Sequence, residues 1–288
     1  MSDSMASLSR QIGSATELHA VVRAMKALAA SNIGQYEAAL RALEGYGRNV
    51  ELGLGACLRG RSGVSAARPA AAAPLAIVFG SDQGLLGQFN EVLAQQAIAT
   101  LRALAGPPRI LAVGARVHAL LCDAGMTPEM LFPVPHSAAA IAPLMTQLQL
   151  LAAPAWQEHG ALPLYICHNR PDPAAVYQPC VERVLPLDAA WQRRLAAQPW
   201  PQGRWPGIIG DADQALARLI GEYLFLALFR AGAESLASEN ASRLAAMTRA
   251  DNDIGQRLKN LGASFNRLRQ DAIDEELFDV IAATAVPV

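Results

Sequence analysis

Hydrophobic positions at both ends of the chain recur in alternating steps of four and three residues. From Leu8 these steps reach Leu54, and from Leu226 they reach Ala272, with 11 of 14 positions apolar in each arm. A sustained 3.5-residue repeat is the pattern of a coiled coil. The positions that break the pattern are His19, Lys26 and Gly47 in the first arm and Arg230, Asn240 and Asp251 in the second.

Proline placement separates these arms from the middle of the chain. Of the 18 prolines, 17 lie within residues 69–206 and the last is Pro287. Because an interior proline costs a helix about 3 kcal/mol, the arms are predicted to be long helices. Helices over residues 5–57 and 209–285 would be about 80 Å and about 115 Å long. Arms at opposite ends of one chain can share a seam only if they run antiparallel, so we expect a helical hairpin; an ordinary helix bundle packed on the middle is the alternative.

The predicted domain organisation has four parts. Residues 1–58 form the N-terminal coiled-coil helix, and the low-complexity stretch "RGRSGVSAARPAAAAP" marks a linker over 59–74. Residues 75–206 form an α/β domain, and residues 207–288 form the C-terminal coiled-coil helix.

The middle of the chain alternates strand-like and helix-like segments. Buried strands are predicted at "LAIVF" (75–79) and "RILAVG" (109–114), with a helix between them, followed by helices over 115–125 and 138–153. The segments 162–170 and 178–187 read as a final strand pair. Strands separated by helices predict a doubly wound, mainly parallel α/β domain.

Composition and charge exclude several function classes. The net charge is −1 and no basic patch is present, which excludes a nucleic-acid partner. The four cysteines form no CxxC pair, which favours reduced thiols in a cytoplasmic protein. No apolar run reaches the 18 to 20 residues that a spanning helix needs, so any membrane contact is expected from outside the bilayer.

A glycine-rich turn, "GSDQGLLGQFN", joins the first strand to a helix and raises the question of a nucleotide. Its glycines, Gly80, Gly84 and Gly87, do not follow the GxGxxG spacing, and no acidic residue follows about 20 positions later. Both lysines lie in the arms, so a P-loop is also excluded. Ser81 and Asp82 fit turn and capping roles. We therefore expect no nucleotide or other cofactor here.

The sequence also carries no catalytic motif. HExxH and GxSxG are absent. Cys167 and His168 are neighbours on a predicted strand and should point to opposite faces. A metal site that combines either of them with His159 or Cys180 is the minor alternative to packed thiols, so we expect neither catalytic residues nor metal ligands.

Four segments, in order, resemble the γ subunit of F-type ATP synthases. The family's first helix contains a motif like "I-T-K-A-M-x-M-V-A-A-S-K", against "VVRAMKALAASN" at 21–32, and its strand-turn "GSDRGLCGGFN" is similar to "GSDQGLLGQFN". Its C-terminal helix carries "SLASE-x-x-x-R-x-x-A-M" and "Y-N-x-x-R-Q-x-x-I-T-x-E-L", against "SLASENASRLAAM" at 235–247 and "FNRLRQDAIDEEL" at 265–277. Beyond about residue 95 the middle domain matches only in its α/β pattern.

This resemblance implies a non-catalytic central stalk, or rotor, that couples ion flow to ATP synthesis or hydrolysis. The coiled coil would turn inside a ring of three α and three β subunits, and the α/β domain would bind the ε subunit and the ring of c subunits. The complex would lie on the cytoplasmic face of a bacterial inner membrane, with this chain peripheral to it. Met25 matches a family methionine near the β-subunit lever, and Arg269 and Gln270 match an Arg-Gln pair that contacts a β-subunit loop.

Several positions depart from the family pattern. Gln83, Leu86 and Gln88 replace the usual Arg, Cys and Gly, and Asp274 stands where Thr is common. These departures indicate a divergent branch, for which the sodium-translocating type is a candidate. Two other functions stay open on the residues alone: an α/β ligand-binding enzyme with helical arms, and a coiled-coil tether without rotary partners.

Overall fold

A computed structural model describes residues 2–59, 73–159, 163–201, 203 and 205–284. The chain divides into two compact units. Met1–Ala30 with Arg243–Val288 form the first, here called the coil unit, and Ser31–Ser242 form the second, the α/β unit. Most of the predicted linker, residues 60–72, lies outside the described residues.

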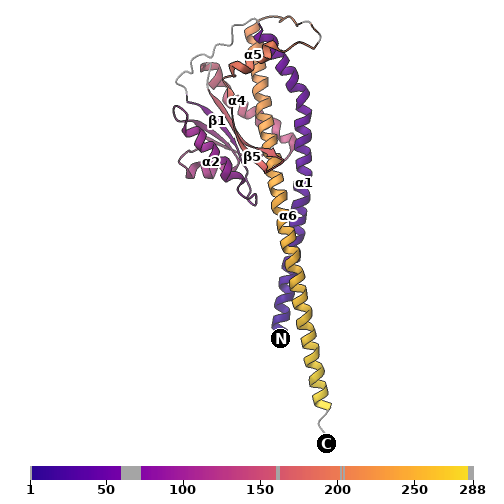
Figure 1. Cartoon of the computed structure of the whole chain (residues 1–288). Coiled ribbons are helices and arrows are strands. Elements are labelled where there is room, and N and C mark those ends of the chain that lie inside the picture. Colours follow the sequence, from indigo (N-terminus) through magenta and orange to yellow (C-terminus); the bar gives the residue numbers. More distant parts are fainter. Residues whose placement is uncertain (1, 60–72, 160–162, 202, 204, 285–288) are drawn as a thin grey trace. The chain divides into compact units, whose positions relative to one another are not determined.

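The two arms form long helices, as the repeat predicts. Helix α1 spans Ser2–Leu58 and helix α6 spans Ala212–Thr284. Both lack interior prolines and are rich in alanine, which has the highest helix propensity. Figure 1 shows both as long continuous helices. Parts of both helices belong to each unit.

Within the coil unit, the polar positions of the two repeats meet each other. His19 Nε2 lies 2.8 Å from Asp251 Oδ1, and Lys26 Nζ donates to Asp251 Oδ2 at 2.9 Å. The apolar seam residues Val22, Ala29 and Met247 are buried. The Lys26 hydrogen bond holds the pKa of Asp251 below its ordinary value. One acid facing two bases across the seam fixes a single register, as polar seam residues do in other coiled coils.

Within the α/β unit the helices are also antiparallel. Asn32 Nδ2 donates to Asn240 Oδ1 at 3.3 Å, and Tyr46 Oη donates to Glu222 Oε2 at 2.6 Å. As the residue number rises along α1, its partner's number falls along α6. The antiparallel pairing predicted from the sequence is confirmed in each unit.

The α/β unit contains a five-stranded sheet of order β3-β2-β1-β4-β5. β1, β2, β3 and β4 are parallel, and β5 pairs antiparallel with β4. The strands are β1 (Leu75–Phe79), β2 (Arg109–Val113), β3 (Met130–Phe132), β4 (Leu164–Asp172) and β5 (Val176–Leu185). The doubly wound, mainly parallel domain is therefore confirmed.

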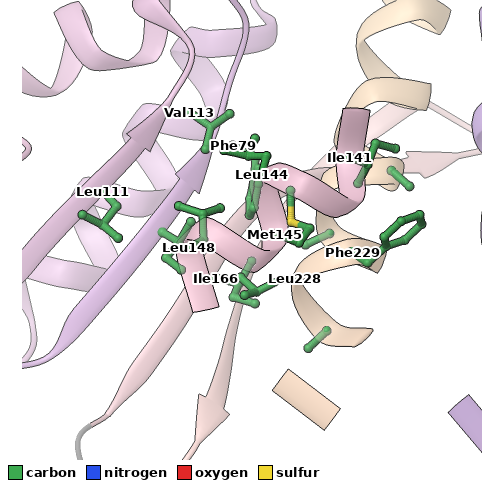
Figure 2. Close-up of a cluster of buried hydrophobic side chains, with 14 of the residues drawn as sticks. Phe79, Leu111, Val113, Ile141, Leu144, Met145, Leu148, Ile166, Leu228 and Phe229 are labelled. Carbon is green, nitrogen blue, oxygen red and sulfur yellow. The ribbon is translucent and has the colours of Figure 1, made fainter. Parts of the chain in front are cut away.

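Alternate residues of β1 enter two different cores, because successive side chains point to opposite faces. Ala76 and Val78 pack with α2 (Phe89–Arg102) and α3 (Ala115–Asp123). Leu75, Ile77 and Phe79 pack with α4 (Ile141–His159) and with α6. Figure 2 shows strand residues of this second core gathered around Leu144, Met145 and Leu148 of α4, with Leu228 and Phe229 of α6. Helix α6 thus serves as part of the domain core as well as half of the coil.

Two short elements have no counterpart in the sequence-based prediction. β3 has three residues, too few for alternation to be visible, and two of them are exposed. Helix α5 (Ala189–Ala197) begins after Asp188, whose carboxylate accepts from Ala190 N. It packs Leu195 against Val50, Leu54 and Leu216, which closes a third core between the end of α1 and the start of α6.

Candidate functional site

The glycine turn after β1 is closed by its own polar side chains. Ser81 N donates to Asn90 Oδ1 at 3.0 Å, and Asn90 Nδ2 donates back to Ser81 Oγ at 2.9 Å. Ser81 Oγ in turn donates to the carbonyl of Gln83 at 3.0 Å. Ser81 and Asn90 are buried, so these bonds satisfy groups that water does not reach.

Asp82 links the turn to two other segments. Its carboxylate accepts from Ala115 N and from Val134 N, each at 2.8 Å. Ala115 is the first residue of α3, so this carboxylate occupies a helix N-terminus of the kind that binds phosphate in nucleotide-binding folds. The turn therefore places a carboxylate of the protein itself at the N-terminus of that helix.

The three predicted turn glycines differ in what surrounds them. A Cβ on Gly80 would lie 2.4 Å from Val117 Cβ, so Gly80 is required for close packing of the turn on α3. A Cβ on Gly84 would meet only the flexible Arg116 side chain, at 3.1 Å, and Gly87, with φ of +62°, faces open space. Gly80 therefore serves packing and Gly87 serves backbone conformation, whereas the structure gives no such requirement for Gly84.

We expect Asp82→Ala to destabilise the α/β unit by about 1–3 kcal/mol, because two backbone N–H groups lose a charged acceptor. The measurement is urea unfolding followed by circular dichroism. Asp123→Ala is the matched control, since Asp123 is exposed at the C-terminal end of the same helix. Equal stability of both variants would contradict the role assigned to Asp82.

A serine-rich face of α6 joins this helix to the carboxyl ends of the strands. Ser235 Oγ donates to the carbonyl of Phe79 at 3.0 Å, Ser238 Oγ to that of Asn169 at 3.1 Å, and Ser242 Oγ to that of Leu86 at 2.6 Å. All three serines are buried. The spacing of three and four residues in "SLASENAS" places their hydroxyls on one face of the helix. The spacing of these serines in the sequence indicates a polar helix face that packs on the strand ends. The resemblance to family motifs does not by itself indicate this face.

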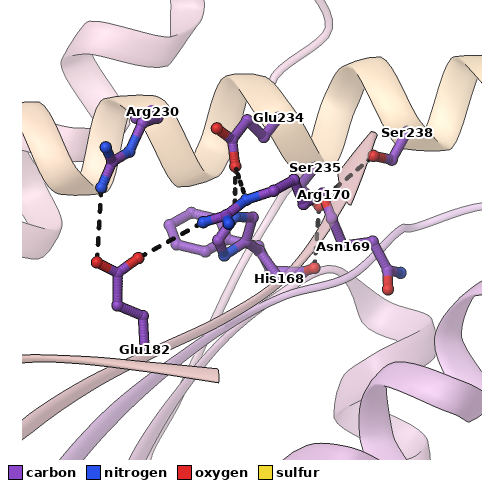
Figure 3. A network of polar contacts seen from close by, with 9 residues as sticks. His168, Asn169, Arg170, Glu182, Arg230, Glu234, Ser235 and Ser238 are labelled. Carbon is purple, nitrogen blue, oxygen red and sulfur yellow. Dashed lines mark hydrogen bonds and ion pairs between the residues drawn. The ribbon is translucent and has the colours of Figure 1, made fainter. Parts of the chain in front are cut away.

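A charged network lies beside this serine face (Figure 3). His168 Nε2 lies 2.8 Å from Glu234 Oε2, and Arg170 Nε donates to the same oxygen at 3.2 Å. Glu182 on β5 accepts a weaker contact from Arg170 at 3.7 Å and one from Arg230 at 3.6 Å. His168 is 2% exposed, whereas the side chains of Arg170, Glu182 and Arg230 are 40%, 38% and 50% exposed, so the network connects β4 and β5 to α6 and runs from a buried histidine out to the surface.

The network sets the ionisation of Glu234. Burial raises the pKa of Glu234, but the hydrogen bond and charge of His168, together with Arg170, outweigh burial and hold that pKa below its ordinary value. A carboxyl whose pKa is lower in the folded than in the unfolded state stabilises the fold at pH values above the unfolded pKa, about 4.3 for Glu. That contribution is lost as the pH falls through the folded pKa.

We therefore expect Glu234→Gln to flatten the acid limb of the stability curve. Wild-type protein should lose more free energy of unfolding than the variant when the pH falls from about 6 to about 3.5. The check is urea unfolding at several pH values, with Glu37→Gln as a control on an exposed carboxylate. Parallel curves for wild type and Glu234→Gln would contradict this assignment.

The predicted metal alternative finds no support among the described residues, where no group of three or more His, Cys, Asp or Glu side chains is placed to hold an ion. Cys167 is buried with α2, where burial raises the pKa of its thiol to about 12. His168 faces α6, so these two neighbours do point to opposite sides, as predicted. The side chain of His159 lies outside the described residues.

The predicted partner-binding residues all lie in the coil unit, at two separate positions along its length. Met25 is half-buried on α1, next to Lys26. Arg269 and Gln270 are exposed on α6, 18 residues and about 27 Å beyond Asp251, the partner of Lys26. The structure therefore does not bring Met25 and the Arg-Gln pair together.

Two apolar stripes accompany these residues. On α1, Leu18, Val21 and Leu28 are 54%, 55% and 64% exposed, and with Met25 they follow the helical spacing of three and four. On α6, Ile273, Leu277 and Phe278 are 55%, 55% and 70% exposed. Contiguous exposed apolar surface of this kind marks an interaction site. Neither stripe belongs to the seam repeat, so the 3.5-residue pattern does not indicate them.

Among the described residues, none of the helices combines the length and hydrophobicity required to cross a bilayer.

Comparisons with known proteins agree with the fold. The model of the ATP synthase family matches residues 4–286. The ATP synthase gamma chain of Variovorax paradoxus is 26% identical over 92% of each chain, and that of Brevibacillus brevis is 24% identical over 98% of each. Among solved structures, the rotor of the Euglena gracilis mitochondrial ATP synthase matches with a TM-score of 0.58 and 16% identity, covering 95% of this chain and 100% of the other. With the family model spanning nearly its whole length, the chain belongs to the ATP synthase family.

Proposed function

We propose that this chain is the γ subunit of an F-type ATP synthase, a non-catalytic central stalk that couples ion flow through a c ring to ATP synthesis or hydrolysis at an α/β ring. The observation that carries the proposal is the coil unit, whose antiparallel helices expose apolar stripes beside Met25 and Arg269. The family match and the γ chains among its relatives support the same assignment.

The proposed contacts follow the chemistry of each surface. Apolar groups such as Met25 and Leu28 can slide against a partner without holding a charge. Arg269 presents five donors in a fixed geometry, which suits a directional and reversible contact with a partner's carbonyl or carboxylate groups. The α and β subunits are assigned to the coil unit, and the ε subunit and c ring are assigned to the α/β unit.

The mechanism assigned to the stalk is mechanical. The helices of the coil unit differ in sequence around their circumference, so three chemically identical β subunits meet different surfaces at any instant. Differential contact energy is what shifts a two-state protein toward one conformation. Rotation of the stalk would then move each β subunit in turn between nucleotide-binding states.

The N-terminus of α3 is occupied by the carboxylate of Asp82, which does not favour a phosphate ligand at that helix end. The assigned location is the cytoplasmic face of a bacterial inner membrane, where the chain is attached only through its complex. The sodium-type branch stays a prediction, because the coupling ion is selected in the c subunit.

The test is co-expression with the α and β subunits of the same organism, followed by native mass measurement and an ATPase assay. We expect one copy of this chain with three α and three β subunits, and sustained ATPase activity only when the chain is present. A chain that never associates with them, or that binds ATP stoichiometrically alone, would refute the proposal.

Arg269→Ala should weaken coupling in the assembled complex and leave the isolated chain intact. Arg269 is exposed, and we expect its loss to change the free energy of unfolding by no more than about 0.5 kcal/mol. ATP-driven ion pumping in reconstituted vesicles should fall relative to ATPase activity. Arg267→Ala, two residues away and also exposed, is the control. If Arg269→Ala unfolds the isolated chain, the residue is structural.

A further inference from the structure

The seam of the α/β unit has a gap at Gly47. This residue occupies a position of the four-three repeat where a coiled coil places a side chain, between Leu43 and Val50. The nearest atom to a Cβ built on Gly47 is Leu226 Cδ1, at 4.0 Å. Gly47 is one of the residues that line a cavity of about 390 Å³ between α1 and α6.

The cavity has apolar walls and a charged rim. This volume lies in the range of small-molecule sites, about 300–1,000 Å³. Each helix contributes residues spaced three or four apart, so the cavity runs along the line where α1 and α6 meet. Its walls are Leu40, Leu43, Tyr223, Leu226 and Ala227, and its charged residues are Glu44, Glu51, Arg230 and Glu234.

The charges at the rim are not balanced. Arg230 lies 3.6 Å from Glu182, and Glu234 is held by His168 and Arg170. Within the part of the chain that the structure describes, no ion pair is seen for Glu44 or Glu51, which sit seven residues, or about 10.5 Å, apart along α1. The cavity therefore combines apolar walls with three carboxylates, Glu44, Glu51 and Glu234, and one guanidinium, Arg230, so its charged residues are mainly negative.

We propose that this cavity is a binding site for an organic cation with an apolar body, such as an aromatic or aliphatic amine. The apolar body packs against Leu43 and Leu226, and the ammonium group pairs with Glu44 or Glu51. Carboxylate partners raise affinity for a cation and disfavour an anion of the same shape. Because the ligand contacts both helices, its binding stabilises their pairing. The proposal does not depend on the stalk function.

The test uses the full-length chain with 2-phenylethylammonium chloride as the probe and sodium 3-phenylpropionate as its anionic counterpart at equal ionic strength. We expect saturable binding of the cation by calorimetry and a rise in the melting temperature, with no such effect of the anion. Replacing both rim acids, Glu44→Gln with Glu51→Gln, should weaken binding at least 10-fold.

Gly47→Leu should abolish binding because the new side chain projects into the cavity where the apolar body of the ligand would pack. Gly45→Leu is its control: it lies on the same helix, where a Cβ meets nothing within 4 Å. If Gly47→Leu fails to fold, Gly47→Ala replaces it, because its Cβ would lie 4.0 Å from Leu226 Cδ1, an ordinary contact distance. The variant with both Glu44→Gln and Glu51→Gln still tests whether binding requires the carboxylates. Equal binding of cation and anion, no saturable binding of the cation, or binding that survives in the folded Gly47→Leu variant would overturn the proposal.

Discussion

Gly114→Ala is expected to unfold the α/β unit or to destabilise it by more than about 4 kcal/mol. Gly114 precedes α3 with φ of +108°, a conformation that L side chains rarely adopt. A Cβ there would also lie 2.7 Å from Ser81 N and 2.8 Å from Ser81 O. Backbone atoms cannot rotate away as a side chain can, so β1 and β2 would have to separate at their carboxyl ends.

The measurement is urea unfolding of the isolated chain, with amide hydrogen exchange to locate the loss. Gly125→Ala is the matched control, because Gly125 also has positive φ (+74°) but a Cβ there meets nothing within 4 Å. We expect Gly125→Ala to cost only about 1 kcal/mol from backbone strain. Similar costs for the two variants would show that the contact with Ser81 does not matter.

The long helices could be predicted because their signal is repeated many times. A 3.5-residue repeat over more than six heptads and the absence of proline both indicate the same structure. Antiparallel pairing followed from the position of the arms in the chain. Which residues meet across the seam could not be predicted, although the positions that break the repeat are the ones involved. His19 and Lys26 contact Asp251, and Gly47 lines the cavity.

The α/β domain was predictable where its strands are buried and long. β1 and β2 read as continuous apolar runs because both faces are covered, whereas β3 is a three-residue edge strand that carries no periodic signal. The role of Asp82 as a cap was predictable from residue type. The two backbone N–H groups that donate to its carboxylate belong to Ala115 and Val134. These residues lie 33 and 52 positions further along the chain, and only the fold brings them close to Asp82.

Helix α6 packs on the sheet through two sequence segments that resemble family motifs. The resemblance identifies these segments but does not say that they contact each other. "GSDQGLLGQFN" and "SLASENAS" are matched as separate blocks, yet Ser235 and Ser242 bind carbonyls beside and within the glycine turn. A small hydroxyl side chain allows the helix backbone to approach the strand ends closely while satisfying buried carbonyl groups. The two blocks are therefore parts of one packed interface, and a change in either would disturb the other.

Replacing Ile273, Leu277 and Phe278 together with serine is expected to weaken association with an α/β ring by at least about 100-fold. The three side chains are more than half exposed in this chain, so their substitution removes little internal packing. Burial of a large apolar side chain contributes about 1.5–3 kcal/mol, and each 1.4 kcal/mol corresponds to a tenfold change in affinity. Even partial burial of three such groups exceeds the predicted loss.

The isolated triple variant should keep its helical content and melting temperature, and its affinity for preassembled α and β subunits can be measured by surface plasmon resonance. The matched control replaces Met130, Leu131 and Leu150 with serine, since these are also exposed apolar residues but belong to the α/β unit, at 44%, 47% and 67% exposure. Loss of ring binding only in the first variant would locate the contact on the last turns of α6. An equal loss of affinity in both variants would indicate that ring binding depends on surface hydrophobicity in general. The apolar stripe of α6 would then no longer support a specific contact with the ring.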